Sequence, residues 1–393
     1  MGFTTLGSNR REFLKTSVAS SAAALFGARL VRAAATNAAT SPAAAPPVEP
    51  TSAPCKVALT NGDSRPDNVV RAMKSLEKEI AQAIGNRRVV IKPNNVVANN
   101  QLASTHADTL DAVLDVLKSM GKLDGAIIAE SGTGNTMQGF GNYGYTAVAE
   151  KYHVELVDLD QTPCQTIMAF DQSDAMPHAV RVSSILANQR DNFIISATPL
   201  KTHNYAIATM SIKNIVLGAP LKFPIQRTAG GFGGGMRMGG GGGGRGGARG
   251  GRMNERAMMP GSDKPILHGG GSRGININIA MLAPLLHPSL SVIDGFEGMQ
   301  GNGPISGTPV DHRVCVVSTD YLAADCVGAH LMGLDPMDVG YLSYLADAKV
   351  GVSDVSEMEI LGESIESLAK KYQLGSSIET QLQWKNPAEV ISS

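Results

Sequence analysis

The sequence has few cysteines, few aromatic residues and little net charge, and each shortage excludes a class of protein. The four cysteines, Cys55, Cys164, Cys315 and Cys326, form no CxxC pair, so we expect no iron–sulfur cluster bound by this chain alone. A formal net charge of −1 indicates neither a nucleic acid nor an acidic partner. Aromatic residues make up 5% of the chain while glycine contributes 44 of 393 residues, which favours an α/β protein with tight loops.

The first 35 residues have the features of an export signal. Arg10 and Arg11 precede Phe-Leu-Lys, and a weakly apolar Ala/Ser-rich stretch leads to an Ala-Ala-Ala site at 33–35. This pattern resembles a twin-arginine (Tat) translocation signal over residues 1–35, and its apolar stretch is too short for a comfortable membrane span. We expect the Tat translocase as a partner during export, no stable span after cleavage, and a periplasmic or otherwise extracytoplasmic location. The alternatives are an uncleaved anchor and a chance basic pair.

The rest of the chain divides by composition. Residues 36–54 are rich in Pro and Ala and predict an extended linker. Residues 55–375 predict one α/β domain, and residues 376–393 a C-terminal tail. Within the domain, residues 228–256 form a Gly/Arg-rich insertion that cannot bury a core and is expected to be disordered. RGG-like tracts can bind single-stranded nucleic acid, but with Phe232 alone as an aromatic we expect a mobile insertion or a flexible lid, and no nucleic-acid partner.

Short apolar strands alternate with helix-like segments along the domain. The expected strands cover residues 55–59, 89–91, 126–129, 154–157, 193–197, 290–293 and 314–317. The alternation predicts an α/β fold with a mainly parallel sheet and helices on both faces. In such sheets, ligands bind outside the carboxyl ends of the strands, so polar residues at those ends are the candidates for function.

Polar side chains do follow these strands. Lys92 and Asn94 follow the second strand, Glu130, Ser131 and Gly132 the third, and Lys201 and His203 the fifth. We expect a helix after Pro199 that carries Thr209, Lys213 and Asn214, with Thr209 and Lys213 on one face. Two lysines beside a histidine suit an anionic ligand or a proton transfer. The alternative is solvated lysines and a structural histidine.

These candidates are assigned three kinds of role. His203, Lys201 and Lys213 are the predicted catalytic residues, with His203 as general acid or base. Cofactor or anion binding is predicted for Lys92, Asn94, Asn214, Ser131 and Gly132. Candidate ligands of a divalent metal are His106, Glu130, His268, Asp294 and Asp320, although their spacing matches no HExxH-type signature. Asp320 is equally well explained as a helix cap, and Asp294 as the start of a turn.

A GxGxxG pattern occurs at Gly139, Gly141 and Gly144. It does not directly follow a strand, so it does not predict a dinucleotide site. The loop 132–144 can still present backbone N–H groups to an anion.

Several segments resemble the DUF362 family when taken together and in order. They are IKPNNV at 91–96, THADTLDAVLDVLKSMGK at 105–122, AESGTG at 129–134, the stretch 196–218, SVIDGFEGMQGNGPISGTP at 291–309 and STDYLAADCVGAHLMGLDP at 318–336. The resemblance covers roughly residues 56–350 and implies a domain whose function is poorly defined. Many members carry a four-cysteine ferredoxin-like motif, which this sequence lacks, and this puts an electron-transfer role in doubt.

One shorter segment has a second resemblance. Residues 211–220 are similar to the lysine loop of lactate-racemase-like proteins, which hold a nickel-pincer cofactor. That resemblance implies a cofactor contact for Lys213, and metal ligation or acid–base function for His203, His106 or His268. A single segment does not assign racemase activity.

The sequence therefore predicts an exported enzyme or cofactor-dependent protein that binds a small anionic molecule through Lys92, Lys201 and Lys213. Two alternatives stay open: a non-catalytic periplasmic binding or maturation protein, and a nucleic-acid binder acting through the RGG-like tract.

Overall fold

The computed structural model describes residues 54–171, 176–222, 261–268 and 270–385. The predicted export signal, most of the linker and the Gly/Arg-rich insertion lie outside these residues. No helix in the described ranges is long and apolar enough to cross a membrane.

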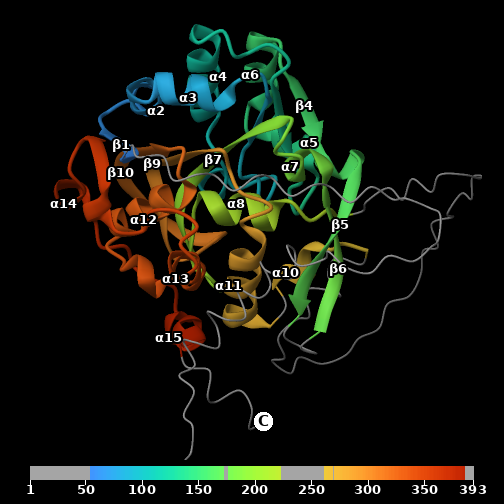
Figure 1. The fold of residues 1–393 in the computed structure, drawn as a ribbon, viewed down its shortest axis with the longest axis vertical. Coiled ribbons are helices and arrows are strands. Elements are labelled where there is room, and N and C mark those ends of the chain that lie inside the picture. Colours follow the sequence, from blue (N-terminus) through green and yellow to red (C-terminus); the bar gives the residue numbers. More distant parts are fainter. Residues whose placement is uncertain (1–53, 172–175, 223–260, 269, 386–393) are drawn as a thin grey trace, which may run out of the picture.

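A mixed sheet forms the centre of the molecule (Figure 1). Its strands are β1 (Cys55–Asn61), β2 (Arg88–Lys92), β3 (Ile127–Glu130), β4 (Glu155–Asp158), β7 (Asn192–His203), β8 (Ile207–Thr209), β9 (Leu290–Asn302), β10 (Ser306–Ser318) and β11 (Met358–Gly362). They lie in the order β11-β1-β10-β9-β7-β2-β3-β4, with β8 paired to β7. The run from β9 to β4 is parallel, so the predicted mainly parallel sheet is confirmed.

Helices cover both faces of this sheet (Figure 1). One layer holds α2 (Arg65–Ser75), α3 (Glu77–Ile84), α4 (Ala107–Ser119) and α6 (Tyr145–Tyr152); the other holds α8 (Ser211–Gly218), α11 (Gly271–Leu282), α12 (Tyr321–Leu331) and α13 (Gly340–Asp347). Alternate residues of β7 face opposite ways: Phe193 and Ile195 pack with the first layer, and Ile194 with the second. The predicted two-sided covering is therefore confirmed.

The remaining short elements lie around these layers. They are α5 (Thr136–Asn142), α7 (Ser184–Ala187), α10 (Lys264–His268), α14 (Ile365–Leu368), α15 (Ile378–Leu382), and the 3₁₀ turns η1 (Gln101–Ala103), η2 (Leu159–Gln161), η3 (Pro336–Asp338), η4 (Val355–Glu357) and η5 (Gln383–Lys385).

The β9–β10 pair departs from the expected parallel pattern. β9 continues to Asn302 and returns as β10, which is antiparallel to both of its neighbours. Ser318 at the end of β10 therefore pairs with Ser291 at the start of β9. The residues after β10 lie at the amino ends of the parallel strands. β2, β3 and β7 end at the opposite edge of the sheet, which we call the carboxyl edge.

The end of β7 also differs from the prediction. The strand runs through Pro199 to His203. The pairing with β9 shifts register between Pro199 and Lys201, and a proline, which has no N–H to donate, is tolerated at such an irregularity. β8 then pairs antiparallel with β7, with Lys201 opposite Thr209. Thr209 is thus a strand residue, and the expected helical face shared by Thr209 and Lys213 is wrong.

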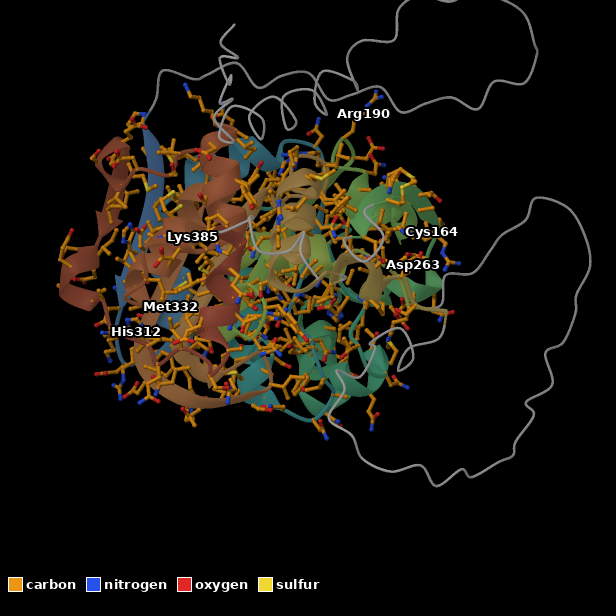
Figure 2. The ribbon with its side chains drawn as sticks, turned by 90° about the horizontal axis from the view of Figure 1, so that it is seen from below. Cys164, Arg190, Asp263, His312, Met332 and Lys385 are labelled. Carbon is orange, nitrogen blue, oxygen red and sulfur yellow. The ribbon has the colours of Figure 1, made fainter. Side chains whose placement is uncertain are left out.

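Residues 159–192 contain a hairpin. β5 (Cys164–Asp171) pairs antiparallel with β6 (Met176–Ser183) beside the main sheet. Asn278 of α11 occupies the β5 edge, because its amide accepts from Phe170 N and donates to Phe170 O at 2.8 and 2.7 Å. Figure 2 shows Cys164 of β5 near Asp263, on the opposite side of the molecule from His312 of β10.

Candidate functional site

A cluster of buried charged side chains lies at the carboxyl edge. Lys92 ends β2, Glu130 ends β3, and Lys201 and His203 lie at the end of β7. Their exposed fractions are 1%, 2%, 0% and 5%. These residues are far apart in the sequence and lie close together in space, because the parallel strands that carry them end at the same edge of the sheet.

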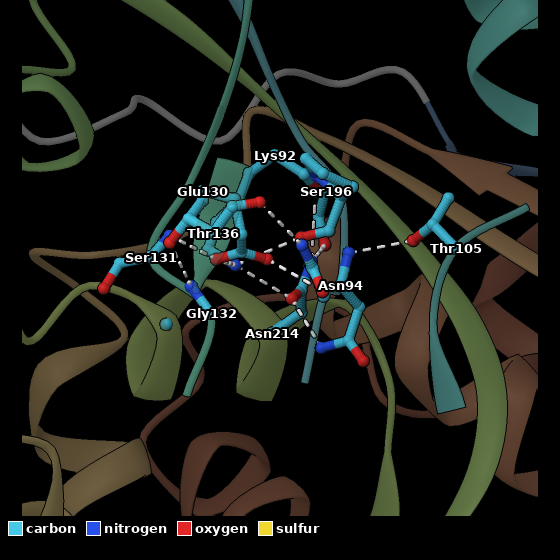
Figure 3. A network of polar contacts seen from close by, with 12 residues as sticks. Lys92, Asn94, Thr105, Glu130, Ser131, Gly132, Thr136, Ser196 and Asn214 are labelled. Carbon is cyan, nitrogen blue, oxygen red and sulfur yellow. Dashed lines mark hydrogen bonds and ion pairs between the residues drawn. The ribbon is translucent and has the colours of Figure 1, made fainter. Parts of the chain in front are cut away.

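Lys92 and Glu130 form a fully buried ion pair (Figure 3). The Lys92 amine lies 2.7 Å from Glu130 Oε1 and donates to Asn214 Oδ1 at 3.1 Å. Burial lowers the pKa of Lys92, and the Glu130 carboxylate opposes this shift. A buried pair of this kind persists only where further hydrogen bonds satisfy both groups, and here the second partner comes from α8.

Two asparagines, Asn94 and Asn214, lie beside this pair (Figure 3) and connect it to Lys201. Lys201 Nζ donates to Asn94 Oδ1 at 2.6 Å, and Asn94 Nδ2 donates to Asn214 Oδ1 at 2.9 Å. The lysines fix both amide orientations, because an ammonium group can only donate. The structure thus brings together Lys92, Asn94, Glu130, Lys201 and Asn214 in one continuous network.

Lys201 is fully buried, and its hydrogen-bond partners carry no charge. Its two hydrogen-bond acceptors are neutral, Asn94 Oδ1 and Ala103 O at 2.5 Å. Burial, followed by the charge of Lys213, lowers the pKa of Lys201 well below its usual value. Lys213, on α8 and 7% exposed, is therefore close enough to act on Lys201 although the two do not share a strand.

The loop after β3 is occupied by its own contacts. Asn95 N and Ser131 N donate to the two oxygens of Glu130 at 3.0 and 2.8 Å, and Gly132 N donates to Thr136 Oγ1 at 3.3 Å. The hydroxyl of Ser131 donates to Asp160 at 2.9 Å. The geometry therefore gives Ser131 and Gly132 a role in holding Glu130 and the loop in place.

Two of the three GxGxxG glycines, Gly139 and Gly144, have structural roles. A Cβ on Gly139 would lie 2.2 Å from Asn95 Nδ2, so only glycine allows α5 to approach the Asn95 side chain. Gly144 has a φ of 77° and precedes α6, a conformation that glycine adopts without strain.

His203 has a defined tautomer. Its Nδ1 accepts from the backbone N–H groups of Tyr205 and Ala206 at 3.1 and 3.3 Å, so the proton of the neutral ring lies on Nε2. Burial, together with the charge of Lys213, lowers its pKa well below the usual value. A neutral ring that already carries its proton on Nε2 cannot accept another there, so this geometry opposes the predicted role as general base and fits a hydrogen-bond donor.

Three charged residues of the cluster did not appear among the sequence candidates: Lys222, Lys264 and Asp160. Lys222 Nζ lies 3.2 Å from Asp160 Oδ2. Lys264 donates to Gly218 O at 3.4 Å, and burial lowers its pKa to about 8. Asp160 follows the end of β4 by two residues and could have been found by the strand-end rule. Lys264 follows no strand, so the sequence offers no signal for it.

His268 enters the cluster from α10. Its Nδ1 lies 3.0 Å from Lys264 O. Burial, with the charge of Lys213 as the next cause, lowers the pKa of His268 to about 4. The charge of Lys213 lowers the pKa of both histidines, and His268 contributes to the lowered pKa of His203, so His268 and His203 lie in one neighbourhood with Lys213.

Two further residues, Asp325 and Thr209, lie beside the start of α8, the helix that carries Lys213. The α8 N-terminus is held by Asp325 of α12, which accepts from Ser211 N and Ile212 N at 2.8 and 3.1 Å; burial raises the pKa of Asp325 to about 8. The Thr209 hydroxyl, opposite Lys201 in the β7–β8 pair, is 2% exposed and makes no hydrogen bond within the described residues.

His106 and Asp294 belong to a different place. Asp294 accepts from Thr109 Oγ1 at 2.6 Å and pairs with Arg65 Nε at 3.1 Å, so it faces α2 and α4 rather than α8. His106 caps α4 by accepting from Asp108 N, and burial, with the charge of Arg65, lowers its pKa. The small pocket at this position is lined by Arg65, Gln101, Leu102, Ser104, His106, Pro199, Asp294 and Glu297.

Asp320 lies at the opposite edge of the sheet. It caps α12 by accepting from Leu322 N and Ala323 N at 2.9 and 3.0 Å, and its second oxygen accepts from Val352 N. The expectation that it joins Glu130 is therefore wrong, because β10 runs antiparallel. In the described ranges, no group of three or more His, Cys, Asp or Glu side chains is arranged to hold a metal ion.

Comparison with protein families identifies the family of this chain. The family model described as "Domain of unknown function (DUF362)" matches residues 89–330, which confirms the resemblance inferred from the sequence segments. No curated protein matches the chain.

Proposed function

Because the chain belongs to the DUF362 family, whose description assigns no activity, we propose its function from the carboxyl edge: it binds a small anion there. The observation that carries the proposal is the fully buried amine of Lys201, whose two hydrogen-bond acceptors within the described residues are neutral oxygens. An isolated buried charge is costly unless a counter-charge accompanies it. A bound anion would supply that counter-charge.

The charges around Lys201 support this proposal. We use the term amine cluster for Lys92, Lys201, Lys213, Lys222 and Lys264. Lys92 pairs with the carboxylate of Glu130, and Lys222 pairs with that of Asp160. The contacts of Lys201 and Lys264 are with uncharged oxygens. Within the described residues, Lys201 and Lys264 therefore add hydrogen-bond donors that no carboxylate accepts.

Each residue has a role in this proposal. Lys201 and Lys213 hold the negative charge, and the Thr209 hydroxyl and the His203 Nε2–H donate to the anion. Lys92, Asn94, Glu130 and Asn214 position Lys201. Binding is common to an enzyme and to a non-catalytic binding protein, and the proposal concerns that shared step.

Calorimetric titration of the full chain with small oxyanions tests the proposal. We expect saturable binding at low ionic strength, and Lys213→Gln should weaken it by at least about tenfold, because a charge-assisted hydrogen bond contributes roughly 1.5–3 kcal/mol. Lys151→Gln is the matched control. It makes the same change on α6, where the Lys151 side chain is 58% exposed and pairs with Asp111.

The outcomes of this titration separate the interpretations. Loss of binding in Lys213→Gln with unchanged affinity in Lys151→Gln supports the site. Equal weakening in both variants indicates only general electrostatic attraction and overturns the proposal, as does the absence of saturable binding by carboxylate, phosphate and sulfate anions alike.

We also propose that the chain is exported by the Tat pathway, on the basis of Arg10 and Arg11 and the Ala-rich segment after them. Replacing both arginines by lysine should retain the uncleaved full-length chain in the cytoplasm of a Tat-competent bacterium. Fractionation and mass measurement of the mature N-terminus test this, and export of the Lys-Lys variant at the wild-type level would contradict it.

A further inference from the structure

Two histidines beside Lys213 carry their protons on opposite nitrogens. His203 Nδ1 receives two backbone N–H groups, so its Nε2 is a donor. His268 Nδ1 lies 3.0 Å from a carbonyl oxygen, Lys264 O, which can only accept, so Nδ1 carries the proton and Nε2 carries the lone pair. The backbone therefore fixes one donor and one acceptor.

The two rings lie in the same electrostatic neighbourhood. Lys213 perturbs both of them, and His268 perturbs His203. The burial that keeps both rings neutral preserves this division, because a protonated His268 would lose its acceptor. A ligand bound between the end of β7 and α10 would meet the donor of His203 and the acceptor of His268.

We propose that this pair of histidines selects an oxyanion that keeps one O–H group at neutral pH, such as hydrogenphosphate, over one that has none, such as sulfate. This inference rests on the proposed anion site and specifies its ligand class. The charged oxygens of the ligand accept from His203 Nε2–H and the lysines. Its O–H donates to His268 Nε2.

The discrimination follows from what sulfate cannot do. Sulfate has only acceptor oxygens at pH 7, so it would place an oxygen lone pair against the lone pair of His268. It would also cover that nitrogen without giving it a hydrogen bond, which costs roughly 1–3 kcal/mol. Hydrogenphosphate has similar size and shape and avoids both costs.

Titration of the full chain with inorganic phosphate, arsenate and sulfate at pH 7 and equal ionic strength tests the proposal. We expect phosphate and arsenate, which both keep an O–H, to bind at least about tenfold more tightly than sulfate. His268→Gln should reduce this ratio toward one, mainly by improving sulfate binding, because a carboxamide can turn its NH₂ toward the ligand.

His203→Gln is the matched control. The same substitution at the donor position should weaken phosphate and sulfate by similar factors and leave their ratio close to the wild-type value. Equal affinity of the wild type for phosphate and sulfate would overturn the selection while leaving the anion site standing. A wild type that binds none of the three anions overturns the selection together with a tetrahedral-oxyanion site; carboxylate binding then decides the broader proposal.

A selectivity ratio unchanged by His268→Gln would also overturn the proposal, because the acceptor would then lie elsewhere. Circular dichroism and the thermal unfolding midpoint of each variant establish that the ratio is measured on folded protein. The ratio compares two ligands on the same variant, so a partial loss of folded material does not alter its interpretation.

Discussion

At the scale of single residues, the Lys92–Glu130 pair shows how the cluster tolerates its charges. Glu130 accepts from Lys92 Nζ, Ser131 N and Asn95 N, so both carboxylate oxygens are used. A buried carboxylate with three donors is held in one position, and it in turn fixes the amine of Lys92. The pair is therefore a rigid support for the network that leads to Lys201.

Glu130→Gln should be strongly destabilising. It leaves the buried Lys92 ammonium without its counter-charge and turns an NH₂ group toward a backbone N–H, so we expect a loss of about 3–5 kcal/mol in the free energy of unfolding. Glu79→Gln is the control, because the Lys56–Glu79 pair has a similar distance, 2.6 Å, with side chains 34% and 39% exposed. Glu79→Gln should lower the free energy of unfolding by less than about 1 kcal/mol. Urea denaturation measures both, and equal losses would contradict the prediction.

Lys264 predicts a pH dependence of stability. Its pKa is lowered to about 8 in the folded chain, against about 10.4 for an unfolded lysine. Between these values the unfolded chain binds more protons, so stability rises with pH across this window and is lowest below about pH 8.

Comparison with Lys264→Met isolates this effect. The free energy of unfolding of the wild type, minus that of the variant, should increase by about 3 kcal/mol from pH 7.5 to 10.5. Denaturation curves at several pH values measure the difference. A difference that stays constant or falls with pH would show that Lys264 is not buried as a cation.

The residue scale also shows where sequence reasoning succeeds. Lys92, Glu130 and Lys201 each lie at the end of an apolar strand, so a parallel sheet brings them together without any motif. The tautomers of His203 and His268 could not be predicted, because they depend on backbone groups of the chain's own turns. Strand patterns thus predict residue types at an edge and leave their protonation undetermined.

At the scale of secondary-structure elements, α8 approaches the sheet closely at one glycine. A Cβ on Gly218 would lie 2.3 Å from Lys92 Cε and 2.5 Å from Lys92 Nζ. Lys92 cannot easily move away, since it is 1% exposed and bonded to Glu130 and Asn214. The glycine therefore sets the distance between α8 and β2.

Gly218→Ala should displace the Lys92 amine and cost about 1–3 kcal/mol, as overpacked substitutions do. It should also weaken anion binding, because Lys92 supports Asn214 and through it Lys201. Gly141→Ala in α5 is the control: a Cβ there meets nothing within 4 Å, and alanine favours a helix over glycine by up to about 1 kcal/mol. Thermal unfolding and titration measure both effects; a neutral Gly218→Ala would contradict the prediction.

Strand direction is the part of the fold that patterns leave open. The apolar runs at 290–293 and 314–317 are both real strands, yet only a tight turn between Asn302 and Ser306 makes the second antiparallel. That one reversal removes Asp320 from the carboxyl edge. An alternation of apolar runs identifies strands and does not give their order or direction, since long-range pairing decides both.

At the scale of the whole molecule, the sheet connects the amine cluster to the C-terminal elements. α15 belongs to the folded domain, although residues 376–393 were expected to form a tail. Gln381 is 1% exposed, and its Oε1 accepts from Ile207 N of β8 at 2.7 Å. Because Ile207 pairs with His203, the C-terminal segment supports the strand end that carries the site.

Two truncations separate the packed part of this segment from the last eight residues of the chain. Removing residues 376–393 deletes the Gln381 contact and Trp384, which is 8% exposed and donates to Asp338 O at 3.0 Å. Loss of a buried tryptophan alone costs about 3–5 kcal/mol, so we expect at least that destabilisation and weaker anion binding. Removing residues 386–393 keeps both contacts and should change neither quantity. Urea denaturation and anion titration compare the two truncations, and Gln381→Ala isolates the contact with β8. If the chain without residues 376–393 were as stable as the wild type, the C-terminal segment would not support the site.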